Sequence, residues 1–392
     1  MKEQDMSVAR VNWTIQAVLA ALLGAFALLA ANNDFDALCY IGRSTASQSS
    51  DAISIHRSAY EAMSRNSVKL EELTHQSDYR ADLFANPYHF AEALPFYSVK
   101  ALFVISILYL HKLGIGWSYT GHVVSAVAYV AAGLLVAFWI SKYVTGPKST
   151  FLWLGIMAVP TMTEAARQFT PDSLSCAFIV LAIWLILERQ HYWLGSSVAV
   201  LAVWIRPDYL LFAGMLTVAL WRIRRLSLGE ASALLGLSLG SYTFLVYFSG
   251  NYGWLLLFQH DFIGYLAAPG EFVVRLHSVL RAYPHVLLAS LPHARFLVAY
   301  YALGGFLLIS GIKREYKAVL AATLLFGLAH ILIFPSWENR FFGPIAVIVS
   351  MSLITVLAQR GAAARAVINA AVDFSTSTSA RRDLPSYSAE AP

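Results

Sequence analysis

Residues 11–36 read VNWTIQAVLAALLGAFALLAANNDFD, and this stretch decides the class of fold. No charged residue occurs between Val11 and Asn33. A helix of that length, which rises 1.5 Å per residue, can cross the roughly 30 Å hydrocarbon core of a bilayer. The run is longer than the apolar core of a secretory signal, and the Ala27–Ala30 stretch fits a cleavage site poorly. We therefore predict an uncleaved first transmembrane helix that ends beside two acidic residues, Asp34 and Asp36.

The rest of the chain is also apolar. Apolar residues make up 58% of the 392 residues and charged residues only 13%, about half the charged share of a soluble domain. Further apolar runs lie near 99–111, 119–141, 150–163, 173–187, 194–205, 208–221, 231–249, 296–312, 318–334 and 341–358. This pattern predicts an all-α polytopic membrane protein.

The positions of the basic residues favour one orientation of these runs in the membrane. If residues 99–111 do not cross, most cations fall in loops on the same side of the membrane as the N-terminus. These cations are Lys142, Lys148, Arg189, Arg222, Arg224, Arg225, Lys313, Arg314 and Lys317. If residues 99–111 do cross, the same loops lie on the outer side of the membrane. The positive-inside rule therefore predicts about ten transmembrane helices with both chain ends in the cytoplasm. The short length of 99–111 still leaves open whether it spans.

This topology divides the chain into a membrane domain, residues 1–360, and a cytoplasmic tail, residues 361–392. Residues 32–118 form one large outer loop, which is too long for a simple connector and contains an apolar stretch able to lie along the bilayer. The tail is rich in Ser, Thr, Ala and Pro and is predicted to be disordered. The net charge of +5 comes from loops beside apolar runs, so it gives no case for a nucleic-acid partner.

Acidic residues and arginines gather in four turns that this topology places at the outer face. They are Asp34 and Asp36 after the first run, Glu164, Arg167 and Asp172 in the next outer loop, Arg206 in a third turn and Arg340 in the last. Such a face suits a polar group carried on a membrane lipid. A structural interpretation stays open for each residue: Asp172 can cap the helix it begins, and Arg206 and Arg340 can reach lipid phosphates.

The arrangement resembles the GT-C superfamily of membrane glycosyltransferases, which use polyprenyl- or dolichyl-phosphate sugars, and is closest to its mannosyltransferase and aminoarabinose-transferase branch. The family pattern has a first helix that ends in acids, a long outer loop with membrane-surface helices, and a second outer loop with Pro-Asp before the next span. The matching residues are Asp34 and Asp36, then Arg167 with Pro171-Asp172, and Arg340 before Pro344 for the family's Arg-aromatic-Pro element. The family's acids are often adjacent, whereas Phe35 separates them here.

The resemblance implies transfer of a sugar from a polyprenyl-phosphate donor to an envelope glycan, lipid or protein. A carboxylate that takes the acceptor's proton contributes roughly 10²–10⁴-fold, and an arginine fork fits a phosphate. Asp36 is the expected base because residues 36–40 look like the family's Asp-small-x-x-Tyr run, and Asp34 then orients the acceptor or holds a divalent cation. The expected substrate-binding residues are Arg340 at the phosphate, then Arg206, with Asp172, Arg167 and Glu164 beside them.

Two other functions stay open, a transporter or flippase of a lipid-linked glycan and a glycan polymerase or ligase. Transporters usually place ionisable residues near the bilayer midplane and often contain repeats, whereas here the charges collect at one face. Polymerases and ligases rely mainly on arginine-rich outer loops. We therefore rank the transferase first and expect it in a bacterial inner membrane, with its site on the periplasmic side. The sequence does not determine the sugar, the acceptor or any metal dependence.

Overall fold

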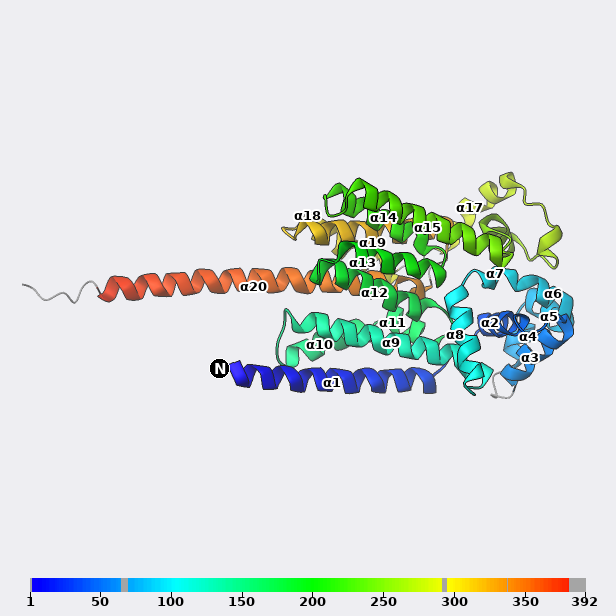
Figure 1. Ribbon diagram of the computed structural model, residues 1–392, viewed down its shortest axis with the longest axis horizontal. Helices are drawn as coiled ribbons and strands as arrows, with labels where there is room; N and C mark the ends of the chain where they lie inside the picture. The colour runs from blue at the N-terminus through cyan, green and yellow to red at the C-terminus, as the bar shows by residue number, and fades with distance from the viewer. Residues whose placement is uncertain (1, 65–69, 291–294, 337, 381–392) are drawn as a thin grey trace, which may run out of the picture.

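The computed structural model describes residues 2–64, 70–290, 295–336 and 338–380. Over these ranges the chain is helical and contains no strand, apart from an isolated bridge between Asn32 and Gln168. The helices form an elongated bundle with a smaller group of short helices at one end (Figure 1). The predicted all-α fold is thus confirmed for the described residues.

Five segments of the described chain are long and apolar enough to cross a membrane. They lie in α1 (Lys2–Leu29), α9 (Trp117–Ser141), α15 (Leu228–Ser249), α19 (Arg314–Ile333) and the stretch Asn339–Gly361, which begins in η5 (Asn339–Phe342) and continues in α20 (Gly343–Ala380). Only 22% of the apolar stretch of α1 and 28% of that of α15 are buried, and large side chains such as Leu22 and Phe26 are exposed on α1. These features are those of a membrane protein.

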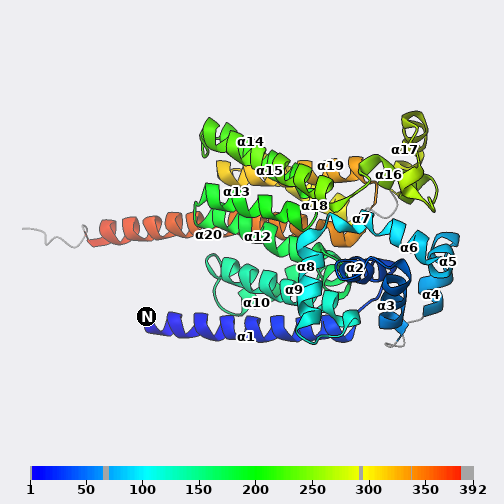
Figure 2. The same ribbon diagram turned by 45° about the vertical axis from the view of Figure 1, so that its right-hand side comes forward.

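Shorter helices occupy other positions where the sequence predicted spans. They are α10 (Pro147–Met157), α12 (Asp172–Glu188), α13 (Tyr192–Leu201) with η1 (Ala202–Trp204), α14 (Tyr209–Arg222) and α18 (Arg295–Ile309). Figures 1 and 2 show them alongside the long helices. The longest, α12, has 17 residues, or about 25 Å, slightly less than the hydrocarbon thickness. The number of about ten spans is therefore not confirmed by helix length.

The segment after α1 forms the group of short helices at one end of the bundle (Figure 1). It contains α2 (Phe35–Ala46), α3 (Ala52–Ser64), α4 (Leu70–His75), α5 (Asp78–Ala85), α6 (Pro87–Ala93), α7 (Pro95–Ser98) and α8 (Ala101–Lys112). These helices share a core of their own, which includes Leu38, Tyr40 and Phe103 and reaches the bundle through Phe169. The predicted outer loop 32–118 is thus a small packed domain.

The segment 99–111, whose crossing the sequence left open, corresponds to α8. This helix has 12 residues, about 18 Å, and is too short to cross alone. The chain bends by 115° between Pro87–Ser98 and Ala101–Lys112. In both views α8 runs across the end of the bundle, at a steep angle to α9 (Figures 1 and 2). This placement is the one expected for a helix that lies along a membrane surface.

Residues 251–290 form a second group at the same end of the bundle (Figure 1). Their elements are α16 (Trp254–Phe258), the π-helix η2 (Gln259–Ile263), η3 (Pro269–Glu271) and α17 (Leu276–Ser290). Asn251 donates a hydrogen bond to the backbone oxygen of Pro95 at 2.7 Å, and the Tyr252 hydroxyl donates to Glu92 at 2.8 Å. These bonds attach the segment to α6 and α7.

The opposite end of the bundle is held by a buried carboxylate. Glu188 accepts hydrogen bonds from Trp139 Nε1 at 2.8 Å, from Lys142 Nζ at 3.0 Å, and from the hydroxyls of Tyr143 and Tyr316 at 2.6 Å each. These contacts join the ends of α9 and α12 to α19. Helix α1 begins and α20 ends on this side of the bundle (Figure 1). The loops with most of the basic residues therefore lie away from the α2–α8 domain.

Helix α20 extends further than the sequence predicted. A disordered tail was expected from residue 361, whereas the helix continues to Ala380. Residues 361–370 read GAAARAVINA, and alanine has the highest intrinsic helix propensity. The small and polar composition that suggested disorder is therefore also compatible with a helix. Residues 381–392 of the predicted tail lie outside the described residues.

Candidate active site

The two outer turns predicted to carry the site lie directly against each other. The Asn32 amide donates a hydrogen bond to the backbone oxygen of Arg167 at 2.9 Å, at the end of α11 (Pro160–Arg167). The Asn33 side-chain oxygen lies 2.7 Å from His122 Nε2 on α9. These contacts fix the chain between α1 and α2, so the carboxylates of Asp34 and Asp36 face the turn between α11 and α12.

Asp34 and Asp36 are held at the start of α2. Asp34 is the N-cap, and its Oδ1 accepts a hydrogen bond from the Ala37 amide at 3.3 Å. Asp36 lies in the first turn, and its Oδ1 accepts a hydrogen bond from the Tyr97 hydroxyl at 3.1 Å. The face of α2 that follows, including Leu38 and Tyr40, is fully buried. The helix therefore has little freedom to move its two carboxylates.

Arg340 joins both carboxylates from the far end of the chain. Its Nη1 donates to Asp34 Oδ2 at 3.1 Å and to Gln168 Oε1 at 2.8 Å, and its Nη2 donates to Asp36 Oδ2 at 3.5 Å. Its Nε lies 3.6 Å from Asp172 Oδ2 and 2.5 Å from Glu338 Oε2, but neither contact has the alignment of a hydrogen bond. The side chain is 9% exposed. A single guanidinium thus links four carboxylates.

Arg206 forms a second centre beside the first. It donates two hydrogen bonds to Asp208, from Nε at 3.1 Å and from Nη2 at 3.0 Å, and a third to Asp172 Oδ1. His330 Nδ1 lies 3.0 Å from Asp208 Oδ2. Asp172 is therefore shared by both arginines. It is the first residue of α12, while Pro171 occupies the N-cap position without a side-chain bond, so helix capping does not explain this acid.

The two arginines also share an aromatic surface. The guanidinium carbons of Arg206 and Arg340 lie 4.5 and 5.1 Å from the centre of the Phe341 ring. Such cation–π contacts stabilise a buried guanidinium and orient its plane. We use the term ion cluster for the two arginines and their carboxylates: Arg206, Arg340, Asp34, Asp36, Asp172, Asp208 and Glu338.

The ion cluster contains five carboxylates and two guanidinium groups. Asp34 responds to its burial and to this excess of negative charge by a change of pKa. Burial and the neighbouring Asp36 raise the pKa of Asp34 from 3.8 to about 7, although Arg340 opposes the shift. A carboxyl group that titrates near neutral pH among other charged groups is typical of functional sites.

Lys100 lies close to the ion cluster and was not predicted. Its ammonium group is 5.1 Å from the Tyr40 ring centre and 5.0 Å from that of Tyr97, the residue that donates to Asp36. Within the described part of the chain, no carboxylate lies at ion-pair distance from it. Burial lowers the pKa of Lys100, and Asp36 raises it. The one feature of the sequence that could have identified Lys100 is that it is a single cation directly before the apolar run of α8.

The structure brings five of the seven predicted residues together: Asp34, Asp36, Asp172, Arg206 and Arg340. Arg167 lies outside the ion cluster, and its Nε donates to the Ala30 backbone oxygen at 2.7 Å. Glu164 accepts a hydrogen bond from Asn339 at 3.1 Å. Both residues fix the turns that carry the ion cluster. Asp208 and Glu338 belong to the ion cluster but were not predicted as site residues. His330 meets Asp208 only because α14 packs against α19.

Comparison of the chain with protein-family models, curated proteins and solved structures gives no match. Among the described residues, no group of three or more His, Cys, Asp or Glu side chains is arranged to hold a metal ion.

The raised pKa of Asp34 predicts a pH dependence. Below about pH 7 Asp34 is protonated and no longer attracts Arg340 by charge, so any reaction that needs this pair should accelerate as the pH rises through that value. Because the folded-state pKa lies above the ordinary value, this group's contribution to stability should fall as the pH rises from 3.8 to about 7. Rates and thermal unfolding measured against pH should show both changes, and Asp34→Asn should remove them. An unchanged rate midpoint in the variant would assign the titration to another group.

Proposed function

We propose that this chain is a membrane glycosyltransferase that moves a sugar from a polyprenyl-phosphate donor to an acceptor hydroxyl. The supporting observation is that Arg340 contacts both Asp34 and Asp36, so an arginine and two carboxylates meet at the end of the bundle beside the α2–α8 domain. A base and a phosphate-binding cation are the groups that a single inverting displacement requires.

Asp36 is the proposed base. It has the longer contact with Arg340, at 3.5 Å, and among the described residues its other oxygen accepts only from Tyr97, whereas Asp34 also caps α2. In the reaction the acceptor oxygen forms a bond to the anomeric carbon as its proton passes to Asp36. The bond between that carbon and the phosphate oxygen breaks, and polyprenyl phosphate leaves with the electron pair. Asp34 orients Arg340.

Lys100 and Arg340 are the proposed cations for the leaving phosphate. Arg340 is surrounded by carboxylates, so it balances their charge as much as it attracts an anion. Lys100 makes no ion pair among the described residues, although Asp36 and Asp172 lie near enough to act on its charge, and its ammonium group lies against two tyrosine rings. We therefore propose that Lys100 attracts the incoming phosphate, a role that the sequence did not suggest. Arg206 acts indirectly, because it holds Asp172.

The proposed topology retains about ten spans and places the ion cluster on the outer, periplasmic side of a bacterial inner membrane. Cysteine labelling tests the sides. Arg224 is exposed at the end of the bundle away from the ion cluster and Ser47 is exposed at the end of α2, while the natural Cys39 and Cys176 are both buried. In intact cells a membrane-impermeant thiol reagent should label Ser47→Cys and spare Arg224→Cys. The reverse labelling would overturn the orientation.

The function is tested by native mass spectrometry of the full chain with added undecaprenyl phosphate, beside Lys100→Met. We expect a bound lipid in the wild-type protein and binding weaker by roughly 10- to 150-fold in the variant, since one charge-assisted contact contributes roughly 1.5–3 kcal/mol. Lys100→Arg should retain most of the binding. Equal binding by all three proteins would contradict the assignment of Lys100. A lipid-linked sugar that is bound and carried across vesicles without transfer would favour a flippase instead.

A further inference from the structure

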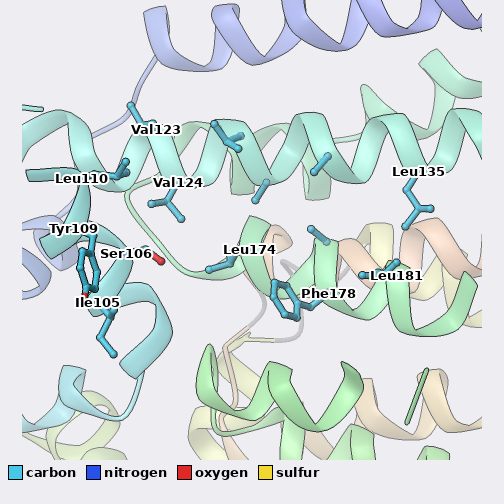
Figure 3. Close-up of a pocket in the computed structure, with 14 residues that line it drawn as sticks. Ile105, Ser106, Tyr109, Leu110, Val123, Val124, Leu135, Leu174, Phe178 and Leu181 are labelled. Carbon is cyan, nitrogen blue, oxygen red and sulfur yellow. The ribbon is translucent and has the colours of Figure 1, made fainter. Parts of the chain in front are cut away.

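Helix α17 exposes leucines and cations side by side, which sets it apart from the surface of the bundle. Where α8, α9 and α12 line an open apolar hollow, the lining includes no charged side chain, and Figure 3 shows residues such as Val124 and Phe178 there. That composition is expected within the hydrocarbon layer, which rejects charge. On α17, by contrast, exposed Leu280 is followed directly by exposed Arg281. A helix surface with both characters is typical of the boundary between hydrocarbon and water.

Residues four apart form three neighbouring rows along α17. The inner row packs against the bundle, since Val279 is buried and Leu287 contacts the main hydrophobic core. The next row, which we call the apolar row, is exposed and consists of Leu276, Leu280, Pro284 and Leu288. The third row, which we call the cationic row, is also exposed and consists of His277, Arg281 and His285. The inner row therefore fixes the helix so that the apolar row and the cationic row both face away from the protein.

Two hydrogen bonds hold this segment at the end of α19, one of the helices long enough to span a membrane. The Tyr283 hydroxyl donates to the Leu332 backbone oxygen at 2.5 Å, and Trp254 Nε1 donates to the Ile333 backbone oxygen at 2.7 Å. Figure 2 shows α17 at a steep angle to α19. Because tryptophan and tyrosine are enriched where spans leave the hydrocarbon, these contacts indicate that α17 lies at the level of the membrane surface.

The charges around α17 are complementary to an anionic surface. Arg275, directly before the helix, and Arg281 are both exposed, while Glu271 is the single acid in residues 264–290. We propose that α17 docks on the membrane leaflet at this end of the bundle, with its apolar row among the acyl chains and its two arginines at anionic phospholipid headgroups. This contact does not depend on the proposed sugar transfer. It fixes the height of residues 251–290 above the membrane.

A fluorescent label on α17 of the full chain tests the docking. Cys39 and Cys176 are buried, so a thiol-reactive NBD probe reaches the cysteine added by Leu280→Cys or by His285→Cys. The labelled proteins are placed in nanodiscs of phosphatidylcholine with or without phosphatidylglycerol. With phosphatidylglycerol present, the Leu280→Cys label should be quenched by a nitroxide on a lipid chain and protected from aqueous iodide. The His285→Cys label, on the cationic row, should show the reverse.

Removal of the two arginines tests the headgroup assignment. Arg275→Gln together with Arg281→Gln should lower the ratio of docked to undocked Leu280→Cys label by about 20- to 30-fold in discs with phosphatidylglycerol, since each cation near an anionic surface contributes about fivefold. In pure phosphatidylcholine the ratio should change by less than about twofold. Arg57→Gln, which removes an exposed cation from α3, is the matched control and should leave the ratio unchanged in both lipids.

The other outcomes would overturn the proposal. Equal quenching of both labels by iodide would mean that the apolar row faces water, as expected for a surface that binds a protein partner instead. Protection of the Leu280→Cys label that is the same in both lipids, with no effect of the two arginine substitutions, would refute binding of anionic headgroups. An equal loss of docking in the Arg57→Gln protein would assign the effect to the net charge of the chain and not to α17.

Discussion

Replacing Asp36 by asparagine should lower the rate of sugar transfer by roughly 10²–10⁴-fold, the usual contribution of a general base. Asparagine has the same shape, and its side-chain oxygen can still accept the Tyr97 hydrogen bond that Asp36 accepts at 3.1 Å. Arg340 keeps its closer contact with Asp34 at 3.1 Å. The variant should therefore insert, fold and bind undecaprenyl phosphate like the wild type. The measurement is the single-turnover transfer rate beside the lipid-binding titration.

Two comparisons make this result specific to Asp36. Asp78→Asn changes an exposed acid in the same α2–α8 domain, and it should leave the rate unchanged. Asp34→Asn should slow transfer less than Asp36→Asn, because Asp34 orients Arg340 and does not take the proton. A fully active Asp36→Asn protein with an inactive Asp34→Asn protein would move the base to Asp34. Activity in the double variant would refute carboxylate catalysis at this site.

The members of the ion cluster were largely predictable, while their pairing was not. Acids directly after an apolar run and arginines in the matching turns were visible in the sequence, because charges are excluded from hydrocarbon. Asp34 and Arg340, however, are 306 residues apart, and nothing in the sequence says that one guanidinium serves both acids of α2. His330 lies inside an apolar run, and nothing in the sequence pairs it with an acid. Its contact with Asp208 requires α14 to pack against α19.

Helix lengths were the least predictable part of the fold. Apolar composition locates a run but does not say where the backbone bends, so 208–221 and 194–205 were expected as spans although α14 has 14 residues and α13 has 10. The segment 99–111 corresponds to a short helix, because the break at Lys100 separates α8 from α7 and turns the chain by 115°. The same break positions Lys100. The lengths of the apolar runs alone do not show where the backbone bends, so they could not identify this residue.

Replacing Arg340 by glutamine should have the largest effect on stability. The change leaves Asp34, Asp36 and Glu338 without the cation that contacts all three. Removal of one partner from a buried ion pair costs about 3–5 kcal/mol, and the partial exposure of the acids, 25% for Asp34 and 29% for Asp36, places this site at the lower end of that range. Thermal unfolding of the purified protein should shift to lower temperature, and transfer should be abolished. Arg340→Lys should recover part of the stability.

A double-mutant cycle distinguishes loss of charge balance from simple loss of packing. If repulsion between unpaired acids destabilises Arg340→Gln, then adding Asp34→Asn should restore part of the stability, because it removes the acid whose pKa already lies near 7. The two changes should therefore be strongly non-additive, as expected for residues in direct contact. For the same reason the defect of Arg340→Gln should shrink as the pH falls toward about 7, because Arg340 lowers the pKa of Asp34 and the variant therefore protonates this acid at a higher pH than the wild type. Additive losses that do not change with pH would mean that Arg340 contributes through its contact with Phe341 and not through its charge.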